Sequence, residues 1–339
     1  MQMQYTRREF VRRSIQATMV AGASWVLPRS KVAASARASE EAPLLPIVDT
    51  HQHLWDVQRL RPPWLDGAAE VLRRSYVTKD YLEATRGLNV VKAVYMEIDV
   101  DPRRHVEEAE QVVALCRSGT HPTVAAVISG RPASSDFRPH ILRFKGNPYI
   151  KGVRQVLHRT DTPPGLCLQE AFVQSMRLLG ELGMSFDLCL RPAELADGIR
   201  LADGCRGTRF ILDHCGNADP KAFLPETAWG GERPSHEADP WRRDIRDFAK
   251  RKNVICKISG IVSRVPRGTW TAEMLAPIIK HCLDEFGPDR VVFGGDWPVC
   301  LVGASYRDWV LALKAVIHSR SEGDQRKLLH DNAVRFYGL

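Results

Sequence analysis

From about residue 43 onward, short apolar runs alternate with longer segments in which apolar residues recur every three or four positions. The short runs are rich in β-branched residues and end in polar loops, which predicts buried strands. We expect strands at 46–53, 90–99, 123–129, 149–157, 184–190, 209–216, 254–260 and 290–296. We expect helices at 104–117, 168–183, 193–204, 239–252, 271–286, 304–319 and 323–337. Eight strands alternating with helices predict a single-domain α/β fold, a (β/α)₈ TIM barrel with a parallel sheet.

Two connections are longer than such a barrel needs. They span 54–80 and 217–240, and each follows a predicted strand. Loops after the strands of a barrel lie at its C-terminal face, where the active sites of this fold are built. We therefore expect both loops to wall a substrate site, with plain surface loops as the alternative.

Polar residues interrupt the apolar runs where the predicted strands end. They are His51, His53, Glu97, Asp99, Lys151, Arg154, Asp187, Asp213, His214, Lys257 and Asp296. In a barrel these ends converge on one mouth. Burying so many charged groups without partners is too costly, so we expect them to pair, bind a metal or line a wet pocket.

The first strand carries three of these titratable groups in one short stretch, IVDTHQHLW at 47–55. Asp49, His51 and His53 occupy alternate positions. Side chains alternate between the two faces of a strand, so the pattern predicts that all three point the same way.

Residues 1–38 have the composition of a targeting segment. Paired arginines, Arg7 and Arg8, precede a moderately apolar run over 15–27, and a small-x-small cleavage pattern follows at 36–38. This arrangement resembles a twin-arginine signal peptide. We expect an exported, periplasmic protein whose mature domain, 39–339, has no membrane anchor; a disordered basic tail is the alternative.

Net charge and cysteine content exclude some classes of protein. Of 48 basic and 40 acidic residues, seven basic and one acidic lie in 1–38, so residues 39–339 carry a net charge of only +2. This balance gives no electrostatic case for a nucleic-acid partner. The eight cysteines form no C-x-x-C pair, and we expect buried thiols, although an exported protein could oxidise a pair.

Several motifs together resemble the amidohydrolase-related superfamily. They are DTHQHLWD, RPPWL, KGVRQVL, FILDHCGNADP, CKISG and FGGDWPV, in this order along the chain. The likeness runs from about Pro43 to Leu339 and is strongest to the lactonase-like TIM-barrel hydrolases, which include fuconolactonase, sulfomuconolactone hydrolase and pyrone-dicarboxylate lactonase.

The resemblance implies one divalent metal ion, Zn²⁺ or a similar ion, bound by His51, His53 and Asp296. Asp296 would also act as general base, and His214 would complete the ligand set or hydrogen-bond the substrate carbonyl. Many metal-dependent relatives carry a histidine at the end of strand five, where this chain has Asp187. A metal-free route, in which Asp296 activates water directly, therefore stays open.

A second group of residues is expected to bind a small-molecule substrate. Lys151 and Arg154, with Lys257 across the mouth, would favour a carboxylate or hydroxyl-rich substrate, and Asp187 belongs to the same predicted substrate-binding group. The alternative is an internal set of salt bridges with Asp187 and Asp213. The tryptophans Trp55 and Trp64 could stack on a sugar ring or serve as packing residues.

The leading hypothesis is a hydrolase that opens a lactone derived from a sugar acid or from aromatic degradation. The alternative is a metal-dependent decarboxylase of an aromatic or related acid on the same barrel. A third hypothesis is a binding protein that uses the mouth as a receptor. The sequence as a whole is compatible with a homodimeric protein. The sequence has no G-x-S-x-G elbow, no glycine-rich phosphate loop and no H-E-x-x-H motif.

Overall fold

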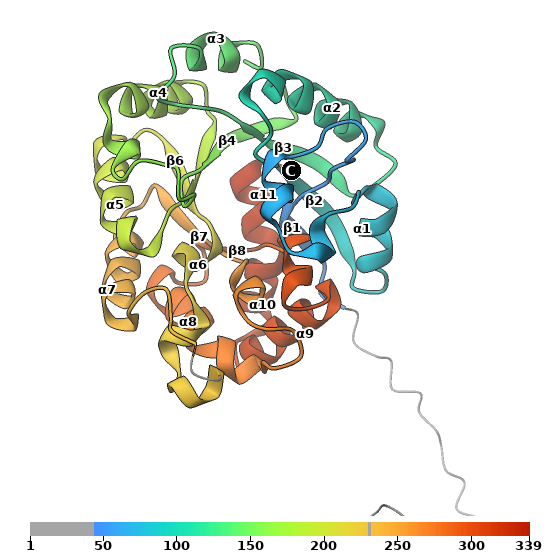
Figure 1. The fold of residues 1–339 in the computed structure, drawn as a ribbon, viewed down its shortest axis with the longest axis vertical. Helices are drawn as coiled ribbons and strands as arrows, with labels where there is room; N and C mark the ends of the chain where they lie inside the picture. The colour runs from blue at the N-terminus through green and yellow to red at the C-terminus, as the bar shows by residue number, and fades with distance from the viewer. Residues whose placement is uncertain (1–43, 230–231) are drawn as a thin grey trace, which may run out of the picture. The chain divides into compact units, whose positions relative to one another are not determined.

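Eight parallel strands follow one another in sequence order around a single sheet (Figure 1). The computed structural model describes residues 44–229 and 232–339, so the predicted signal peptide at 1–38 lies outside the described residues. The strands are β1 (Ile47–Gln52), β2 (Val90–Met96), β3 (Thr123–Ser129), β4 (Ile150–Val156), β5 (Ser185–Cys189), β6 (Arg209–Leu212), β7 (Val254–Ile258) and β8 (Val291–Phe293).

The sheet closes where β8 meets β1. The Thr50 hydroxyl donates to the Phe293 carbonyl at 2.7 Å, and the His53 amide donates to the Trp297 carbonyl at 2.7 Å. Eight parallel strands that alternate with helices and nearly close on themselves confirm the predicted TIM barrel.

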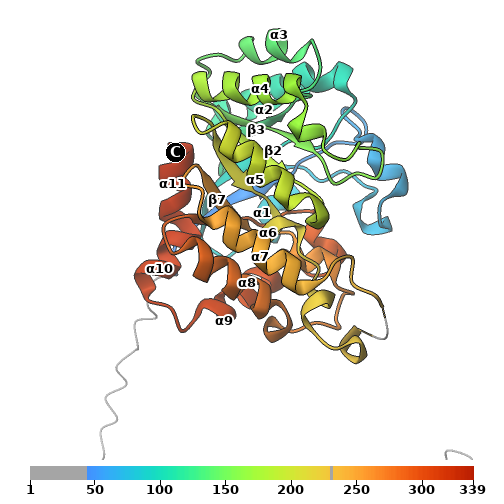
Figure 2. The ribbon, with the colours of Figure 1, turned by 90° about the vertical axis from the view of Figure 1, so that its left-hand side faces the viewer.

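Helices form the outer layer, and Figure 2 shows several of them along one side of the molecule. They are α1 (Thr78–Ala84), α2 (His105–Ser118), α3 (Phe137–Leu142), α4 (Glu170–Glu181), α5 (Leu195–Gly204), α6 (His214–Asn217), α7 (Ala238–Ala249), α8 (Ala272–Phe286), α9 (Tyr306–Ile317), α10 (Glu322–Arg326) and α11 (Asn332–Tyr337). A π-helical turn, Lys327–Asp331, joins α10 to α11.

Several boundaries differ from the predicted ones. The sixth and eighth strands end at Leu212 and Phe293, earlier than expected, because the backbone adopts left-handed conformations at His214 and Asp296 just beyond them. The short helices α1 and α3 were not predicted, since six or seven residues give little periodic signal. The last predicted helix, 323–337, is divided by the π-helical turn.

The barrel interior is a small apolar cluster, separate from the larger core between sheet and helices. Its buried members are Val48, Val94, Met96, Ala125, Val127, Ile211, Ile255 and Val292, together with Ala333 and Tyr337 of α11. In this way α11 packs against the barrel interior at the end opposite the strand C-termini. No helix in the described part of the chain is long and apolar enough to cross a membrane.

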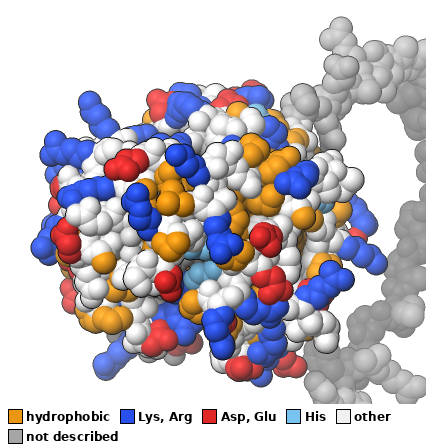
Figure 3. Space-filling view, turned by 90° about the horizontal axis from the view of Figure 1, so that it is seen from above, with side chains coloured by type: hydrophobic (Ala, Val, Ile, Leu, Met, Phe, Trp, Pro, Cys, Tyr) orange, Lys and Arg blue, Asp and Glu red, His pale blue; other side chains and the backbone are white. Residues whose placement is uncertain are grey.

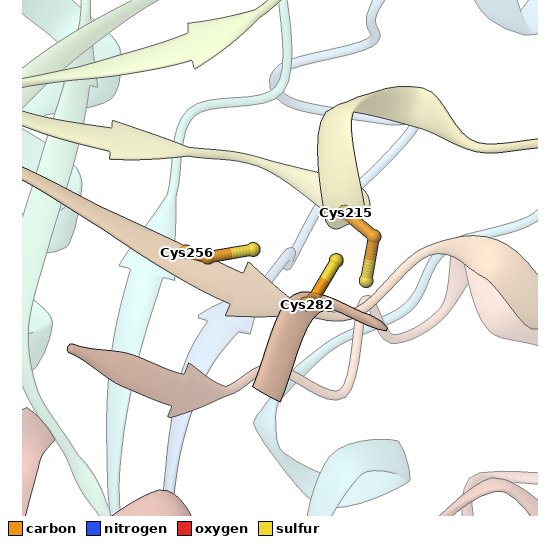
Figure 4. A group of neighbouring side chains, drawn as sticks. All are labelled: Cys215, Cys256 and Cys282. Carbon is orange, nitrogen blue, oxygen red and sulfur yellow. The ribbon is translucent and has the colours of Figure 1, made fainter. Parts of the chain in front are cut away.

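All eight cysteines are free and buried, as expected from the sequence. Cys215, Cys256 and Cys282 bring three sulfur atoms within 4.8 Å of one another (Figure 4). These thiols come from α6, β7 and α8, so they pack where three elements meet. Buried thiols behave as small apolar side chains, and the cluster fills this junction.

Candidate active site

Three histidines and an aspartate, at or just beyond the ends of strands far apart in the sequence, meet at the C-terminal end of the barrel. Asp296 Oδ1 lies 3.5 Å from His53 Nε2 and 3.7 Å from His51 Nε2. One side-chain atom each from His51, His214 and Asp296 lies within 4.8 Å of the others. The structure thus brings together the four residues that the sequence singled out for catalysis and metal binding.

The orientation of His53 is set by the backbone of the neighbouring strand. Its Nδ1 lies 3.0 Å from the Met96 carbonyl at the end of β2. A carbonyl can only accept, so Nδ1 carries a proton, and Nε2 is the ring nitrogen that faces Asp296. A histidine that ligates a metal commonly donates its other ring nitrogen in this way.

His214 is presented by a tight turn directly after β6. His214 and Cys215 both have φ near +53°, and Ser259 Oγ lies 2.9 Å from His214 Nδ1. The facing residue, Gly260, has φ +71°, and a Cβ there would lie 2.3 Å from His214 Nδ1. Gly260 is therefore required twice, for its left-handed conformation and for the space that the imidazole occupies.

Asp49 does not join this cluster, contrary to the alternation predicted for the first strand. Its carboxylate accepts from the Tyr81 hydroxyl at 2.9 Å, the Tyr306 hydroxyl at 3.1 Å and the Gly295 amide at 2.7 Å. The pairing of β1 with β2 shifts register between Asp49 and Gln52, which breaks the strict alternation. Asp49 therefore ties β1 to α1, α9 and the chain after β8.

Beneath the four residues lies a network of fully buried charges. Lys257 Nζ is 2.6 Å from Asp187 Oδ2, 2.9 Å from Asp213 Oδ1 and 3.3 Å from His51 Nδ1. Burial by itself lowers the pKa of Lys257, but the two carboxylates outweigh it and the net pKa is raised. The internal salt-bridge alternative therefore describes Lys257 and Asp187, which are sealed from solvent and cannot reach a substrate.

The same network sets the charge states of its other members. Burial raises the pKa of Asp187 to about 7, whereas Lys257, His214 and Arg154 overcome burial and lower the pKa of Asp213 to about 2. Burial and the nearby Lys257 ammonium lower the pKa of His51 far enough to keep its imidazole neutral at physiological pH.

A cavity of about 290 Å³ opens above the cluster. Its polar and aromatic lining consists of His53, Trp64, Asp99, Arg154, His158, Arg159, His214, Asn217, Ser263, Arg264 and Asp296. Histidine side chains are visible near the centre of the molecular face in Figure 3, among acidic and basic groups. A concave site with convergent polar groups is the usual form of a small-molecule site.

Of the six residues expected to bind substrate, Arg154 and Trp64 line this cavity. The other four do not: Lys257 and Asp187 belong to the buried network, and Lys151 and Trp55 lie elsewhere. Lys151 stands near the N-terminal start of β4, and its Nζ donates to the Gly338 carbonyl at 3.1 Å, so its predicted place at the mouth is wrong. Trp55 is buried, donates from Nε1 to the Arg74 carbonyl and packs edge-on against Trp64. Trp55 is therefore a packing residue that supports the cavity wall.

Five polar residues of the cavity were not predicted from the sequence: His158, Arg159, Asn217, Ser263 and Arg264. His158 and Arg159 directly follow β4 and could have been found by extending each strand end by three residues. Burial lowers the pKa of His158 to about 3, so it is a neutral hydrogen-bonding group at pH 7. Asn217 and Arg264 lie in turns after β6 and β7, where the sequence gives no signal for cavity lining.

A family model described as Amidohydrolase matches residues 48–339. The chain belongs to the amidohydrolase family. L-fucono-1,5-lactonase from Burkholderia multivorans is 26% identical over 301 residues, which cover 86% of this chain and 96% of that protein. This chain is therefore an amidohydrolase that is similar in sequence to a lactonase.

Solved amidohydrolase structures share the fold. An amidohydrolase from Burkholderia multivorans with bound Zn has a TM-score of 0.72 at 23% identity, covering 87% of this chain and 99% of that one. A 5-carboxyvanillate decarboxylase from Novosphingobium aromaticivorans, in complex with manganese, has a TM-score of 0.59 at 15% identity, covering 87% and 96%.

The donor set of this amidohydrolase fits a divalent metal ion. Ligands about 2.0–2.2 Å from a tetrahedral ion lie roughly 3.3–3.6 Å from each other, close to the 3.5 and 3.7 Å that separate Asp296 Oδ1 from the two imidazoles. His51 Nε2 is also 3.2 Å from Arg154 Nη1, so an ion and this guanidinium would compete for one lone pair. The donor atoms that lie within 4.8 Å of one another belong to His51, His214 and Asp296. His214, which the resemblance gave only as an optional ligand, is therefore one of them.

Proposed function

We propose that this amidohydrolase opens a lactone by attack of water on the ring carbonyl. The observation that carries the proposal is the position of Asp296, a carboxylate that lines the cavity within 3.7 Å of two imidazoles. The similarity to a fuconolactonase supports a cyclic ester as the substrate class.

In the proposed reaction Asp296 is the general base. It takes a proton from water as the oxygen attacks the carbonyl carbon, and the ring C–O bond of the tetrahedral intermediate then breaks. The protonated Asp296 returns the proton to the leaving alkoxide, which gives a hydroxy acid. His214, neutral because burial lowers its pKa, is held through Nδ1 by Ser259 and presents Nε2 toward the carbonyl oxygen.

We further propose Zn²⁺ as the ion, held by His51, His53 and Asp296, with His214 adjacent. When bound, a divalent ion polarises a carbonyl and lowers the pKa of water. Asp296 would contribute one oxygen to the ion and keep the other for the proton. Metal content measured by elemental analysis in wild type and in His53→Ala tests the ligand set.

Lactone hydrolysis and decarboxylation can be separated with one protein preparation. We expect acid release from a panel of aldonolactones, aldarolactones and muconolactones, and a loss of about 10²- to 10⁴-fold in kcat/KM in Asp296→Asn. Lys151→Met is the matched control, because its side chain lies at the other end of the barrel. Release of CO₂ from aromatic acids without turnover of any lactone would contradict the proposal in favour of a decarboxylase.

The binding-protein hypothesis makes a different forecast for the same variant. If the mouth of the barrel only binds a ligand, Asp296→Asn changes the affinity for that ligand, and neither the wild type nor the variant hydrolyses a lactone.

We also propose that the protein is exported through its twin-arginine leader and acts on small molecules in the periplasm. Replacing Arg7 and Arg8 by lysine should leave the precursor uncleaved in the cytoplasm. The size of the protein in periplasmic and cytoplasmic fractions is the measurement, and an unchanged mature form would contradict the proposal.

A further inference from the structure

One guanidinium in the wall of the cavity is not paired with any carboxylate of the described residues. Arg264 ends the 3₁₀ turn Ile261–Arg264 that follows β7, and it lines the same cavity as His214 and Asp296. Its Nη2 donates to Asn217 Oδ1 at 3.1 Å. Among the residues whose side chains the structure describes, no carboxylate oxygen lies within 4.0 Å of the Arg264 guanidinium.

The two other arginines of the cavity form ion pairs with carboxylates of the protein. Arg154 Nε donates to Glu97 Oε1 at 2.6 Å, and Arg159 donates to Asp99 at 2.9 Å and to Asp161 at 2.9 Å. Their charges are neutralised by the protein itself. Among the described residues that line the cavity, Arg264 is therefore the cation left for a ligand.

The surroundings of Arg264 increase its need for a counter-ion. Burial lowers the pKa of Arg264, and the more distant Asp219 and Asp296 oppose this shift only in part. Both oxygens of Asp219 already accept backbone amides, from Lys221 at 3.1 Å and Ser235 at 2.9 Å. A guanidinium stays protonated at physiological pH, so the cavity wall keeps a poorly compensated positive charge.

We propose that Arg264 binds a carboxylate of the substrate, so that the amidohydrolase acts on lactones carrying a free acid group in preference to neutral lactones. This inference rests on the proposed lactonase function. Arg264 Nη2 carries two N–H groups, so one can stay on Asn217 while the other, with an N–H of a neighbouring nitrogen, donates to the carboxylate. The neutral His158 adds a hydrogen-bonding group without opposing charge. Asp296 and His214 reach the ring carbonyl in the same cavity.

The test compares two substrates that differ only in the acid group. An aldarolactone carries a free carboxylate where the matching aldonolactone carries CH₂OH. We expect kcat/KM to be about 10- to 100-fold higher for the aldarolactone, as for other charge-assisted contacts. Arg264→Gln should abolish this preference, mainly by raising KM for the aldarolactone.

Two further variants keep the result interpretable. Arg264→Lys retains the charge but loses the two-pronged geometry, and it should recover part of the preference. Arg267→Gln is the matched control, because Arg267 is an exposed arginine three residues further along the same loop. Thermal unfolding of each variant shows whether the fold is kept. Competitive inhibition by glutarate, an acyclic dicarboxylate, gives a readout besides turnover, and we expect it to weaken at least tenfold in Arg264→Gln.

The outcomes separate this inference from the function on which it rests. If no lactone of the panel is hydrolysed, the lactonase proposal fails. If both are hydrolysed equally well, or if Arg264→Gln slows both to the same extent, the lactonase proposal stands and the carboxylate site is overturned.

Discussion

The buried charged residues of this amidohydrolase have two different roles. The role depends on whether the residue lies on the cavity side of His51, His53, His214 and Asp296 or below them. Arg154 and Arg264 face the cavity, whereas Lys257 and Asp187 are sealed below it. A buried ion pair costs desolvation on both partners, so the network contributes stability only while every member is present.

Removing the ammonium from this network should destabilise the protein strongly. Lys257→Met leaves Asp187 and Asp213 buried without their cation, and we expect the free energy of unfolding to fall by about 3–5 kcal/mol. Urea unfolding followed by circular dichroism is the measurement. Lys151→Met, which removes one partly exposed hydrogen bond to Gly338, should cost less than about 1 kcal/mol. Equal losses in the two variants would show that Lys257 is not a structural centre.

At the scale of elements, the turns after β6, β7 and β8 position the site. His214 and Asp296 have left-handed φ angles near +53°, a conformation that costs a non-glycine residue about 1 kcal/mol or more. Asp49 helps to hold this region, since its carboxylate ties the Gly295 amide after β8 to hydroxyls from α1 and α9. A Cβ at Gly295 would lie 2.6 Å from Asp49 Oδ2, so that position needs glycine as well.

A methyl group in the turn after β7 should displace His214 and slow the reaction. Gly260→Ala places a Cβ 2.3 Å from His214 Nδ1, and we expect kcat/KM to fall about 10²-fold or more, since misplacement by about 1 Å has effects of this size. Steady-state kinetics on the best lactone of the panel is the measurement.

The chain offers a closely matched control for this variant. Gly268 also has a left-handed backbone, with φ +78°, and nothing lies within 4 Å of a Cβ at that position. Gly268→Ala should carry a similar backbone cost without the contact to the imidazole. A comparable loss of activity in both variants would mean that backbone strain, and not the position of His214, is responsible.

At the scale of the whole molecule, the barrel buries several histidines in neutral form, which couples folding to pH. Burial lowers the pKa of His105 from 6.5 to about 4, with the Arg131 charge as a smaller contribution. The native state then binds this proton less readily than the unfolded chain does. Stability from His105 is present above pH 6.5 and is lost as the pH falls toward 4.

Replacing this histidine should therefore flatten the acid side of the stability profile. In His105→Asn the side chain does not titrate, and we expect a smaller drop in unfolding free energy between pH 7 and pH 4.5 than in wild type. His158, with a pKa of about 3, shifts in the same direction, so part of the drop should remain. Urea unfolding at the two pH values tests this, and parallel losses in both proteins would contradict it.

Local patterns in the sequence determined the barrel and the four residues of the site. Alternating strand and helix periods are short-range properties, and chemistry at the ends of parallel strands has one place to converge, so His51, His53, His214 and Asp296 could be predicted to meet. The family motifs at the same strand ends pointed to lactone hydrolysis.

Only the tertiary structure decided which charges face the cavity and which neutralise each other. A register shift in β1 turned Asp49 away from His51, and the position of Lys151 along β4 placed it at the opposite end of the barrel. The unpaired charge of Arg264 is also a consequence of the tertiary structure. Whether a guanidinium has a carboxylate within 4 Å depends on contacts between residues distant in sequence, and no local pattern records those contacts.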